Sequence, residues 1–296
     1  MTTVLDGGMS NALAERGQDL ADDLWTARLL RDAPDEIAAV HRAYFAAGAT
    51  VATTASYQAS LEGFVHVGLS RKEAESLIVR SVTLAREVRD ALAEDGVDRL
   101  VAASVGPYGA FLADGSEYRG RYGVSRTRLH DFHRPRIELL ASAGPDLLAV
   151  ETVPDADEAE VLAEIVADVG VPGWLSYSIA GDSTRAGQPL EDAFAVATGV
   201  GALVAVGVNC CDPDDVAAAL DVAARVTGKP GVAYPNSGQG WDNGTHSWVG
   251  PASYDVNLAP DWVARGAAYV GGCCQVGPKD IAALAQVLSS SRNGRQ

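Results

Sequence analysis

Residues 147–178 read LLAVETVPDADEAEVLAEIVADVGVPGWLSYS. Two short apolar runs in this stretch, 147–151 and 173–178, have the length and composition of buried strands. The longer segment between them, 156–169, is rich in alanine and charged residues and has the period of a helix. A strand, a helix and a second strand in this order are the repeating unit of a parallel α/β sheet.

The same alternation recurs along the whole chain. Further strands are expected at residues 3–7, 50–56, 100–105, 203–209, 230–234 and 268–271. Further helices are expected near residues 35–47, 71–93, 125–142, 190–200, 214–226, 259–266 and 278–288. Eight pairs of a strand and a helix predict a single (β/α)8 TIM barrel, an α/β fold for which about 250 residues is typical.

One barrel accounts for most of the 296 residues. We expect it to span residues 1–288, and we expect residues 289–296, which are small, polar and basic, to form a flexible tail. An open doubly wound sheet is the competing architecture, but no Gly-x-Gly-x-x-Gly motif follows the first strand. The loops 106–122 and 236–258 are long enough to cover a barrel mouth.

Composition and charge restrict the class of protein. Hydrophobic residues make up 47% of the chain and charged residues 21%, as in globular proteins. The formal net charge of -16, with no basic stripe, argues against a nucleic-acid partner. We find no signal peptide and no apolar run of about 18 residues, so we expect a cytoplasmic protein without a membrane partner. Oligomeric state is left open by the sequence.

The active site of such a barrel forms at the carboxyl ends of its strands. Distinctive residues follow the predicted strands at that end: Asp6-Gly7-Gly8, Ser56-Tyr57-Gln58, Gly106-Pro107-Tyr108-Gly109, Glu151-Thr152, Asn209-Cys210, Tyr234-Pro235-Asn236-Ser237-Gly238 and Cys273-Cys274. The sixth and eighth strands lie close together around a barrel mouth. We therefore expect Cys210, Cys273 and Cys274 to share one site.

The four cysteines form two adjacent pairs, Cys210-Cys211 and Cys273-Cys274, unlike a zinc finger or a disulfide framework. Zinc binds thiolates and prefers four tetrahedral ligands, so three converging cysteines leave one position for another ligand. Such a centre suits a substrate thiol, because the bound metal lowers the thiol pKa. Cys211 is the weakest candidate, since neighbouring side chains at a strand end point to opposite sides.

The last pair of thiols raises a geometric question. Cys273 and Cys274 can face one metal only if the chain bends after the eighth strand, and Gly271-Gly272 supplies the backbone freedom for such a bend. Two other interpretations remain open. In the first, the cysteines are small hydrophobic residues of the core. In the second, which is less favourable, Cys273 and Cys274 form a strained vicinal disulfide.

Together these residues resemble a known family. The motifs, in order, are Asp6-Gly7-Gly8, Gly106-Pro107-Tyr108-Gly109, Glu151-Thr152, Gly207-Val208-Asn209-Cys210, Tyr234-Pro235-Asn236-Ser237-Gly238 and Gly271-Gly272-Cys273-Cys274. Over nearly the whole chain this set closely resembles the homocysteine S-methyltransferases. The resemblance implies a zinc-bearing, homocysteine-binding (β/α)8 barrel that methylates homocysteine to methionine. It also implies that Cys210, Cys273 and Cys274 are the Zn²⁺ ligands, with Cys211 outside the ligand pattern.

The branches of this family differ in methyl donor. From its length we expect the protein to be without the C-terminal arm of the betaine-using enzymes and without the folate and cobalamin domains of the large methionine synthases. Residues 104–118, SVGPYGAFLADGSEY, are most similar to the short bacterial and plant enzymes that use the sulfoniums S-methylmethionine or S-adenosylmethionine. Residues 239–242 read Gln-Gly-Trp-Asp, where the family commonly carries Glu and Tyr.

Homocysteine carries an ammonium and a carboxylate besides its thiol. We expect Asp6 and Glu151, both at strand ends, to bind the ammonium group, which is also where the resemblance places it. Candidates for the carboxylate are the backbone N–H groups of Gly7 and Gly8 and the hydroxyls of Thr54 and Ser56. Asn209 is expected to orient a ligand or contact substrate, with a turn-forming role as the alternative.

Four aromatic residues are candidates for a donor pocket that attracts the sulfonium by cation–π interaction: Tyr57, Tyr108, Tyr234 and Trp241. No separate general base is assigned, because the metal displaces the thiol proton. Alternative functions are a noncatalytic zinc- or redox-responsive thiol protein on the same barrel, and methylation of another thiol or of a selenol such as selenocysteine. A thiol-metal hydrolase is disfavoured by the lack of histidine ligands.

Overall fold

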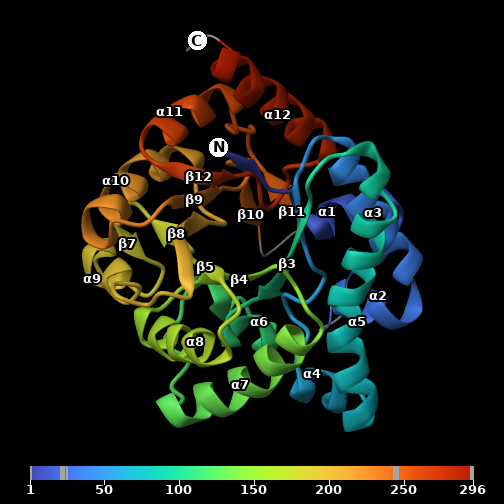
Figure 1. Cartoon of the computed structure of the whole chain (residues 1–296). Coiled ribbons are helices and arrows are strands. Elements are labelled where there is room, and N and C mark those ends of the chain that lie inside the picture. The colour runs from blue at the N-terminus through green and yellow to red at the C-terminus, as the bar shows by residue number, and fades with distance from the viewer. Residues whose placement is uncertain (1, 21–23, 25, 243–246, 294–296) are drawn as a thin grey trace.

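Eight parallel strands form a nearly closed barrel, and helices surround it (Figure 1). The computed structural model describes residues 2–20, 24, 26–242 and 247–293. The barrel strands are β1 (Thr3–Val4), β2 (Val51–Thr53), β3 (Leu100–Val105), β4 (Leu147–Val153), β5 (Gly173–Tyr177), β8 (Leu203–Asn209), β9 (Gly231–Tyr234) and β12 (Ala267–Val270). From β2 to β12, each barrel strand pairs with the one that follows it, and β12 pairs with β1, which confirms the predicted (β/α)8 barrel.

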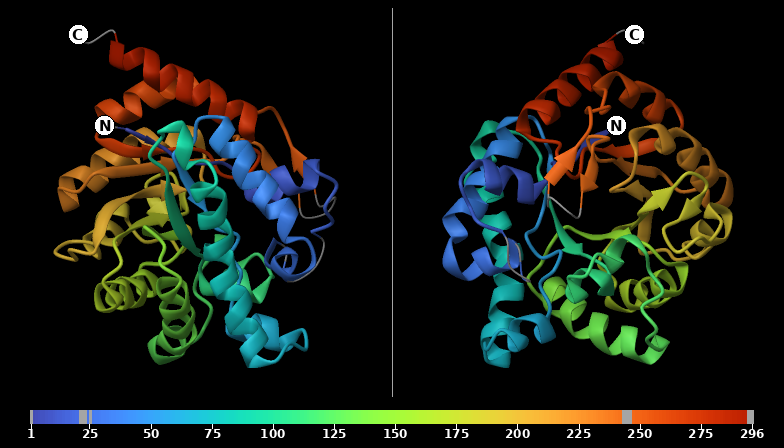
Figure 2. Two further views of the ribbon diagram at one scale, coloured as in Figure 1. Left: turned by 45° about the vertical axis from the view of Figure 1, so that its right-hand side comes forward. Right: turned by 180° about the vertical axis from the view of Figure 1, so that it is seen from behind.

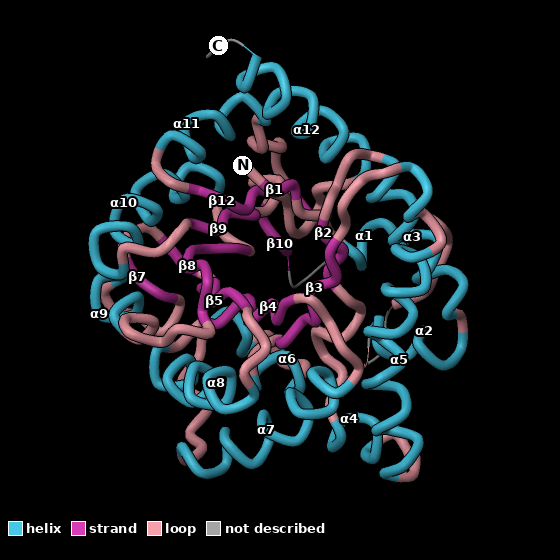
Figure 3. The backbone as a smooth tube through the Cα atoms, in the orientation of Figure 1, coloured by secondary structure: helices cyan, strands magenta, loops and turns pink. Residues whose placement is uncertain are grey.

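The helices form an outer ring around the barrel strands (Figure 3), which is also seen from behind (Figure 2). The eight helices that follow barrel strands are α3 (Pro34–Ala46), α5 (Arg71–Asp90), α7 (Arg126–Ser142), α8 (Ala156–Val169), α9 (Leu190–Ala195), α10 (Val216–Thr227), α11 (Ala259–Ala264) and α12 (Pro278–Asn293). All eight lie where the sequence predicts a helix. Helix α12 continues to Asn293, into the segment for which a tail is expected, and residues 294–296 lie outside the described part.

Several short elements escape the sequence analysis, since fewer than two helical turns give too little periodicity to detect. They are the helices α1 (Met9–Glu15), α2 (Thr26–Asp32), α4 (Leu61–His66) and α6 (Tyr108–Leu112), the 3₁₀ turns η1 (Ala93–Asp95), η2 (Ser116–Tyr118), η3 (Pro213–Asp215) and η4 (Val256–Leu258), and the hairpins β6 (Ile179–Ala180) with β7 (Ser183–Thr184) and β10 (Gly240–Asp242) with β11 (Ser247–Val249). Among the described helices, none is long and apolar enough to cross a membrane.

Two separate apolar clusters stabilise the barrel. Alternate residues of each strand point to opposite faces, so that Val101 and Ala103 of β3 pack in the larger cluster toward the helices, whereas Ala102 packs in the smaller one. The smaller cluster fills the barrel interior, where Trp174 is fully buried and packs edge-on against Tyr234, with ring centroids 6.2 Å apart.

The barrel closes between β1 and β2 through hydrogen bonds of the backbone and of side chains. The Thr50 N–H donates to Val4 O at 2.8 Å. Beyond it, the Asp6 carboxylate accepts hydrogen bonds from the backbone N–H of Thr53 at 2.7 Å and from its hydroxyl at 2.8 Å. A residue singled out as a substrate ligand therefore also joins the first two strands.

Gly207 marks a place in the barrel wall where only glycine fits. A Cβ there would lie 1.9 Å from the carbonyl oxygen of Val232 on the paired strand β9, whereas a Cβ at Gly201 would meet no atom within 4 Å.

We predict that Gly207→Ala destabilises the protein by about 1–3 kcal/mol or prevents folding, because the strands β8 and β9 must separate. The matched control Gly201→Ala is expected to change the unfolding free energy by no more than about 1 kcal/mol. Urea denaturation of both variants measures this difference, and equal stabilities would contradict the packing argument.

Candidate metal centre

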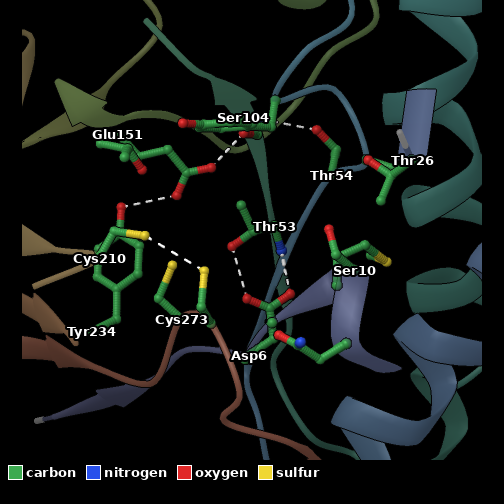
Figure 4. Close-up of a pocket in the computed structure, with 18 of the residues that line it drawn as sticks. Asp6, Ser10, Thr26, Thr53, Thr54, Ser104, Glu151, Cys210, Tyr234 and Cys273 are labelled. Atoms are coloured by element: carbon green, nitrogen blue, oxygen red, sulfur yellow. Dashed lines mark hydrogen bonds between the residues drawn. The ribbon is translucent and has the colours of Figure 1, made fainter. Parts of the chain in front are cut away.

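Three cysteine side chains meet at the carboxyl end of the barrel. Cys210 follows β8, and Cys273 and Cys274 follow β12. Their Sγ atoms all lie within 4.8 Å of one another, and those of Cys210 and Cys274 are 3.6 Å apart (Figure 4). Within the described residues, no other group of His, Cys, Asp or Glu side chains is arranged in this way. The structure brings together the three thiols that the sequence singles out.

This donor set fits a soft metal ion. Tetrahedral zinc with Zn–S bonds of about 2.3 Å places its sulfur ligands about 3.8 Å apart, and the spacing of Cys210 and Cys274 is close to that value. Hydrogen bonds from Cys273 and Cys274 lower the pKa of Cys210 well below its usual range, so the cluster favours a thiolate there. Three protein ligands leave one position for a further ligand.

A left-handed backbone conformation turns Cys210 toward the other two thiols. Its φ angle is 51°, a conformation that non-glycine residues rarely adopt and that often marks a functional site. The next residue, Cys211, is 1% exposed and belongs to the apolar core between barrel and helices. The two adjacent thiols therefore have different surroundings, and Cys211 lies apart from the centre.

The sequence analysis assigned the bend after β12 to the backbone freedom of Gly271 and Gly272, but the bend uses no left-handed glycine. Neither Gly271 nor Gly272 has a positive φ angle, and the left-handed residue is Gln275, at 61°. What Gly272 provides is space, because a Cβ there would lie 2.1 Å from the side chain of Val276. The turn is held by a hydrogen bond from the Gln275 N–H to the Asn11 side chain at 2.7 Å.

A pocket opens beside the three thiols. The residues expected to bind substrate or donor that line it are Asp6, Gly7, Gly8, Thr54, Tyr57, Glu151 and Tyr234 (Figure 4). Residues that line it without having been expected are Met9, Ser10, Asn11, Thr26, Thr53, Ala55, Ser104, Tyr118 and Thr152. Among these described lining residues there is no Arg, Lys or His, so the side chains that can carry charge here are carboxylates and thiolates.

Glu151 is held in place by two hydroxyl groups. Ser104 donates to one carboxylate oxygen and Tyr234 donates to the other at 3.0 Å (Figure 4). The phenol of Tyr234 also accepts a hydrogen bond from the indole N–H of Trp174 at 2.8 Å. Burial raises the pKa of Glu151 to about 7, against the effect of these hydrogen bonds.

Asp6 has the same electrostatic character. Burial raises its pKa to about 7, although both hydrogen bonds from Thr53 favour the ionised form. Two buried carboxyl groups with pKa values near neutrality thus line one pocket. Each is stabilised as a carboxylate by a cation placed close to it.

Asn209 is completely buried and does not line the pocket. Its side-chain oxygen accepts a hydrogen bond from the Thr152 N–H at 2.7 Å, and its NH₂ group donates to the Thr152 hydroxyl at 2.8 Å. Thr152 has a left-handed φ of 58°, which these contacts stabilise. The NH₂ group also points at Cys273 Sγ, 4.0 Å away. Asn209 therefore orients its neighbours and has no surface for contact with substrate.

Two expected binding residues occupy other places. Ser56 is 1% exposed and outside the pocket, and its hydroxyl donates to the carbonyl of Ser104 at 2.8 Å. Tyr108 packs with Phe132, with ring centroids 4.9 Å apart, and is likewise absent from the pocket wall. Both follow strand ends, but their side chains face the barrel wall and the surrounding helices.

Gly8 and Trp241 complete the set of expected binding residues. Gly8 lines the pocket, but its N–H donates to the carbonyl of Val276 at 3.0 Å and is not free for a carboxylate. A Cβ on Gly8 would lie 2.7 Å from the carbonyl oxygen of Cys273, so its glycine serves close packing. Trp241 lies on strand β10, and its side chain is outside the described part of the structure.

Tyr118 is the main residue of this site that the sequence analysis did not identify. It belongs to η2 in the loop between β3 and α7, and its hydroxyl lies 3.5 Å from Cys210 Sγ. The loop is tethered at its far end by Tyr122, whose hydroxyl donates to Glu158 at 3.0 Å. The only indication of Tyr118 in the sequence analysis was the prediction that the loop 106–122 is long enough to cover the barrel mouth.

The fold and the site define the protein as a (β/α)8 barrel with a cluster of three cysteines that could hold a metal ion. Comparison with known proteins identifies the family. A family model described as homocysteine S-methyltransferase matches residues 3–288. The chain is 45% identical to the Escherichia coli (strain K12) homocysteine S-methyltransferase, over 95% of this chain and 93% of the other. It is 44% identical to maize homocysteine S-methyltransferase 4, over 96% and 89% of the two chains.

A solved structure agrees with these relatives. The metallated form of the homocysteine methyltransferase MmuM from Escherichia coli superimposes with a TM-score of 0.87 and 43% identity, covering 96% of both chains. The chain belongs to the homocysteine S-methyltransferase family. The resemblance inferred from the separate motifs is therefore confirmed.

We predict that Cys273→Ala abolishes stoichiometric metal binding, because the centre then has only two thiol ligands. The matched control is Cys211→Ala, which removes a thiol from the core and should leave the metal content unchanged. Zinc content per chain after dialysis, measured by elemental analysis, tests both variants. Full zinc occupancy in Cys273→Ala would show that the ligand assignment is wrong.

The carboxyl group of Asp6 predicts a dependence of stability on pH. Because its pKa is raised from 3.8 to about 7 in the folded protein, its stabilising contribution is complete below pH 4 and is lost as the pH rises through 7. The unfolding free energy of the wild type should therefore fall as the pH rises from 4 to 7. In the isosteric variant Asp6→Asn, this decrease should be smaller by up to about 1.4 kcal/mol per pH unit. Denaturant unfolding at several pH values between 4 and 8 gives the slopes, and identical slopes would refute the prediction.

Proposed function

We propose that this enzyme transfers a methyl group from a sulfonium donor, S-methylmethionine or S-adenosylmethionine, to the thiol of L-homocysteine, giving methionine. The observation that carries the proposal is the cluster of three thiols beside a pocket with two buried carboxyl groups. Membership of the homocysteine S-methyltransferase family supports the acceptor. The metal and the donor are inferred from the chemistry of the site.

Cys210, Cys273 and Cys274 would hold zinc, which, when bound, keeps the substrate sulfur in its nucleophilic thiolate form at neutral pH. We assign no separate general base to the chain. Tyr118 and Asn209 orient the thiol ligands through the contacts at 3.5 Å and 4.0 Å described above.

The two carboxyl groups of the pocket suit the ammonium group of an amino acid. Asp6 and Glu151 are held in the pocket wall by hydrogen bonds to separate strands, β2 for Asp6 and β3 and β9 for Glu151. An ammonium group between them would compensate the cost of burying two carboxylates. For the substrate carboxylate, the N–H of Gly7 remains a candidate at the pocket wall. The hydroxyl of Thr54 also lines the pocket, but its hydrogen is donated to Ser56 at 2.6 Å, because the Ser56 hydroxyl itself donates to Ser104.

The charge of the pocket favours a cationic donor. Its described lining carries carboxyl and thiol groups together with Tyr57, Tyr118 and Tyr234, and no cationic side chain. Aromatic faces attract cations by about 0.5–2 kcal/mol each. A sulfonium loses its positive charge when its methyl–sulfur bond breaks and the methyl group bonds to the thiolate, leaving two neutral thioethers. The pocket residues exclude water around this charge change.

Methionine formation by zinc-loaded, reduced enzyme tests the proposal, with S-methylmethionine, S-adenosylmethionine and betaine supplied separately. We expect turnover with a sulfonium donor, and kcat/KM for betaine lower by on the order of a hundredfold or more. Turnover with betaine alone would refute the donor assignment. Stoichiometric zinc without homocysteine-dependent turnover with any donor would refute the reaction.

A further inference from the structure

The loop between β3 and α7 contains a buried carboxyl group that the chemistry described so far does not use. Glu117, in η2, is 4% exposed, and its Oε2 atom has no hydrogen-bond partner in the described structure. Among the described residues, no Arg, Lys or His forms an ion pair with it. An ionised carboxylate in such a place is costly unless a cation or a set of donors compensates it.

Glu117 lies beside the thiol centre. The next residue, Tyr118, lines the pocket and contacts Cys210 Sγ at 3.5 Å. The charge of Glu117 also acts on Tyr57, another residue of the pocket wall, because it raises the pKa of that phenol further above the value set by burial. Burial raises the pKa of Glu117 to about 7, and the thiolate charge of Cys210 contributes to this rise. The carboxyl group is therefore close enough to interact electrostatically with both Tyr57 and Cys210.

The backbone fixes this position. A Cβ on Gly109 would lie 2.4 Å from the Glu117 nitrogen, so η2 packs directly on the first turn of α6. Further along, the Arg121 N–H donates to Asp155 at 3.1 Å, and Tyr122 contacts Glu158. These contacts hold the backbone of η2, and with it the position of Glu117.

We propose that Glu117, which lies behind the pocket wall and does not line the pocket itself, is a specificity-determining residue whose charge attracts the sulfonium donor to the faces of Tyr118 and Tyr57. The inference rests on the proposed function, in which Asp6 and Glu151 are taken by the ammonium group of homocysteine. Of the buried carboxyl groups around the centre, Glu117 is then the one left for a second cation. Its place next to Tyr118 and Tyr57 combines a carboxyl group, which a nearby cation would keep ionised, with aromatic faces, an arrangement that distinguishes a sulfonium from a neutral thioether.

The test measures binding and does not require turnover. Isothermal calorimetry gives the Kd of S-methylmethionine, of S-adenosylmethionine and of methionine, a neutral thioether, for zinc-loaded wild type and for Glu117→Gln without homocysteine. We expect Glu117→Gln to weaken binding of a sulfonium by about tenfold or more and to leave methionine binding unchanged. Glu117→Asp should restore part of the loss.

Asp114→Asn is the matched control, because Asp114 lies in the same loop and is exposed. It removes the same charge and should leave the preference for sulfonium over thioether unchanged. Zinc content and the KM for homocysteine of Glu117→Gln should equal those of wild type, and its unfolding midpoint should not fall. If Glu117 had a purely structural role, the substitution would weaken binding of all ligands and lower the unfolding midpoint together.

The outcomes separate the two proposals. If wild type binds a sulfonium more tightly than methionine and Glu117→Gln loses this preference, the inference holds even when no methyl transfer is detected. If methyl transfer occurs but the preference survives in Glu117→Gln, the inference is overturned and the proposed function stands. A wild type that binds neither sulfonium better than methionine would also overturn the inference.

Discussion

Asp6 makes the contacts on which the rest of the site depends. Its carboxylate receives both hydrogen bonds from Thr53 and so joins the first strand to the second. Its carbonyl oxygen accepts a hydrogen bond from the N–H of Gly272 at 3.2 Å, immediately before the two thiols that follow β12. One residue therefore connects the closure of the barrel with the position of two of the three cysteines, and the same carboxyl group forms part of the pocket wall.

A second set of buried polar groups links the remaining strands. Tyr234 donates to Glu151 and Ser176 donates to Asn209 at 2.7 Å, and the hydroxyl oxygens of Tyr234 and Ser176 lie 2.7 Å apart. These residues lie on β4, β9, β5 and β8, so four strands contribute to one connected network. Such networks position side chains strongly when every member has a partner. The left-handed turns at Thr152 and Cys210 lie at its ends, where strain is compensated by these contacts.

The sequence predicted the barrel well because each strand is an apolar run and each long helix has a clear period. The location of all eight barrel strands and of the eight following helices agrees with the structure. For the site, strand ends identified Asp6, Glu151 and the three cysteines, since parallel strands present their carboxyl ends at one edge. The short elements α1 and η2 were missed, and with them Tyr118.

The positions of the motifs in the sequence could not predict the directions in which their side chains point. Ser56 and Tyr108 follow strand ends like the true lining residues, yet they face the wall and the helices. Glycines were also ambiguous: Gly272 is required for space and not for a positive φ angle, and the Gly8 N–H is used within the fold. These outcomes depend on contacts between distant segments, which a single sequence does not display.

The two carboxyl groups with pKa values near 7 have a thermodynamic consequence. At neutral pH, Asp6 and Glu151 are partly protonated in the free protein, and a cation that binds between them must expel those protons into the solvent. The buffer takes them up, so the heat observed on binding will include the ionisation enthalpy of the buffer. Calorimetry of one ligand in two buffers would thus count the protons released and report the charge state of the pocket directly.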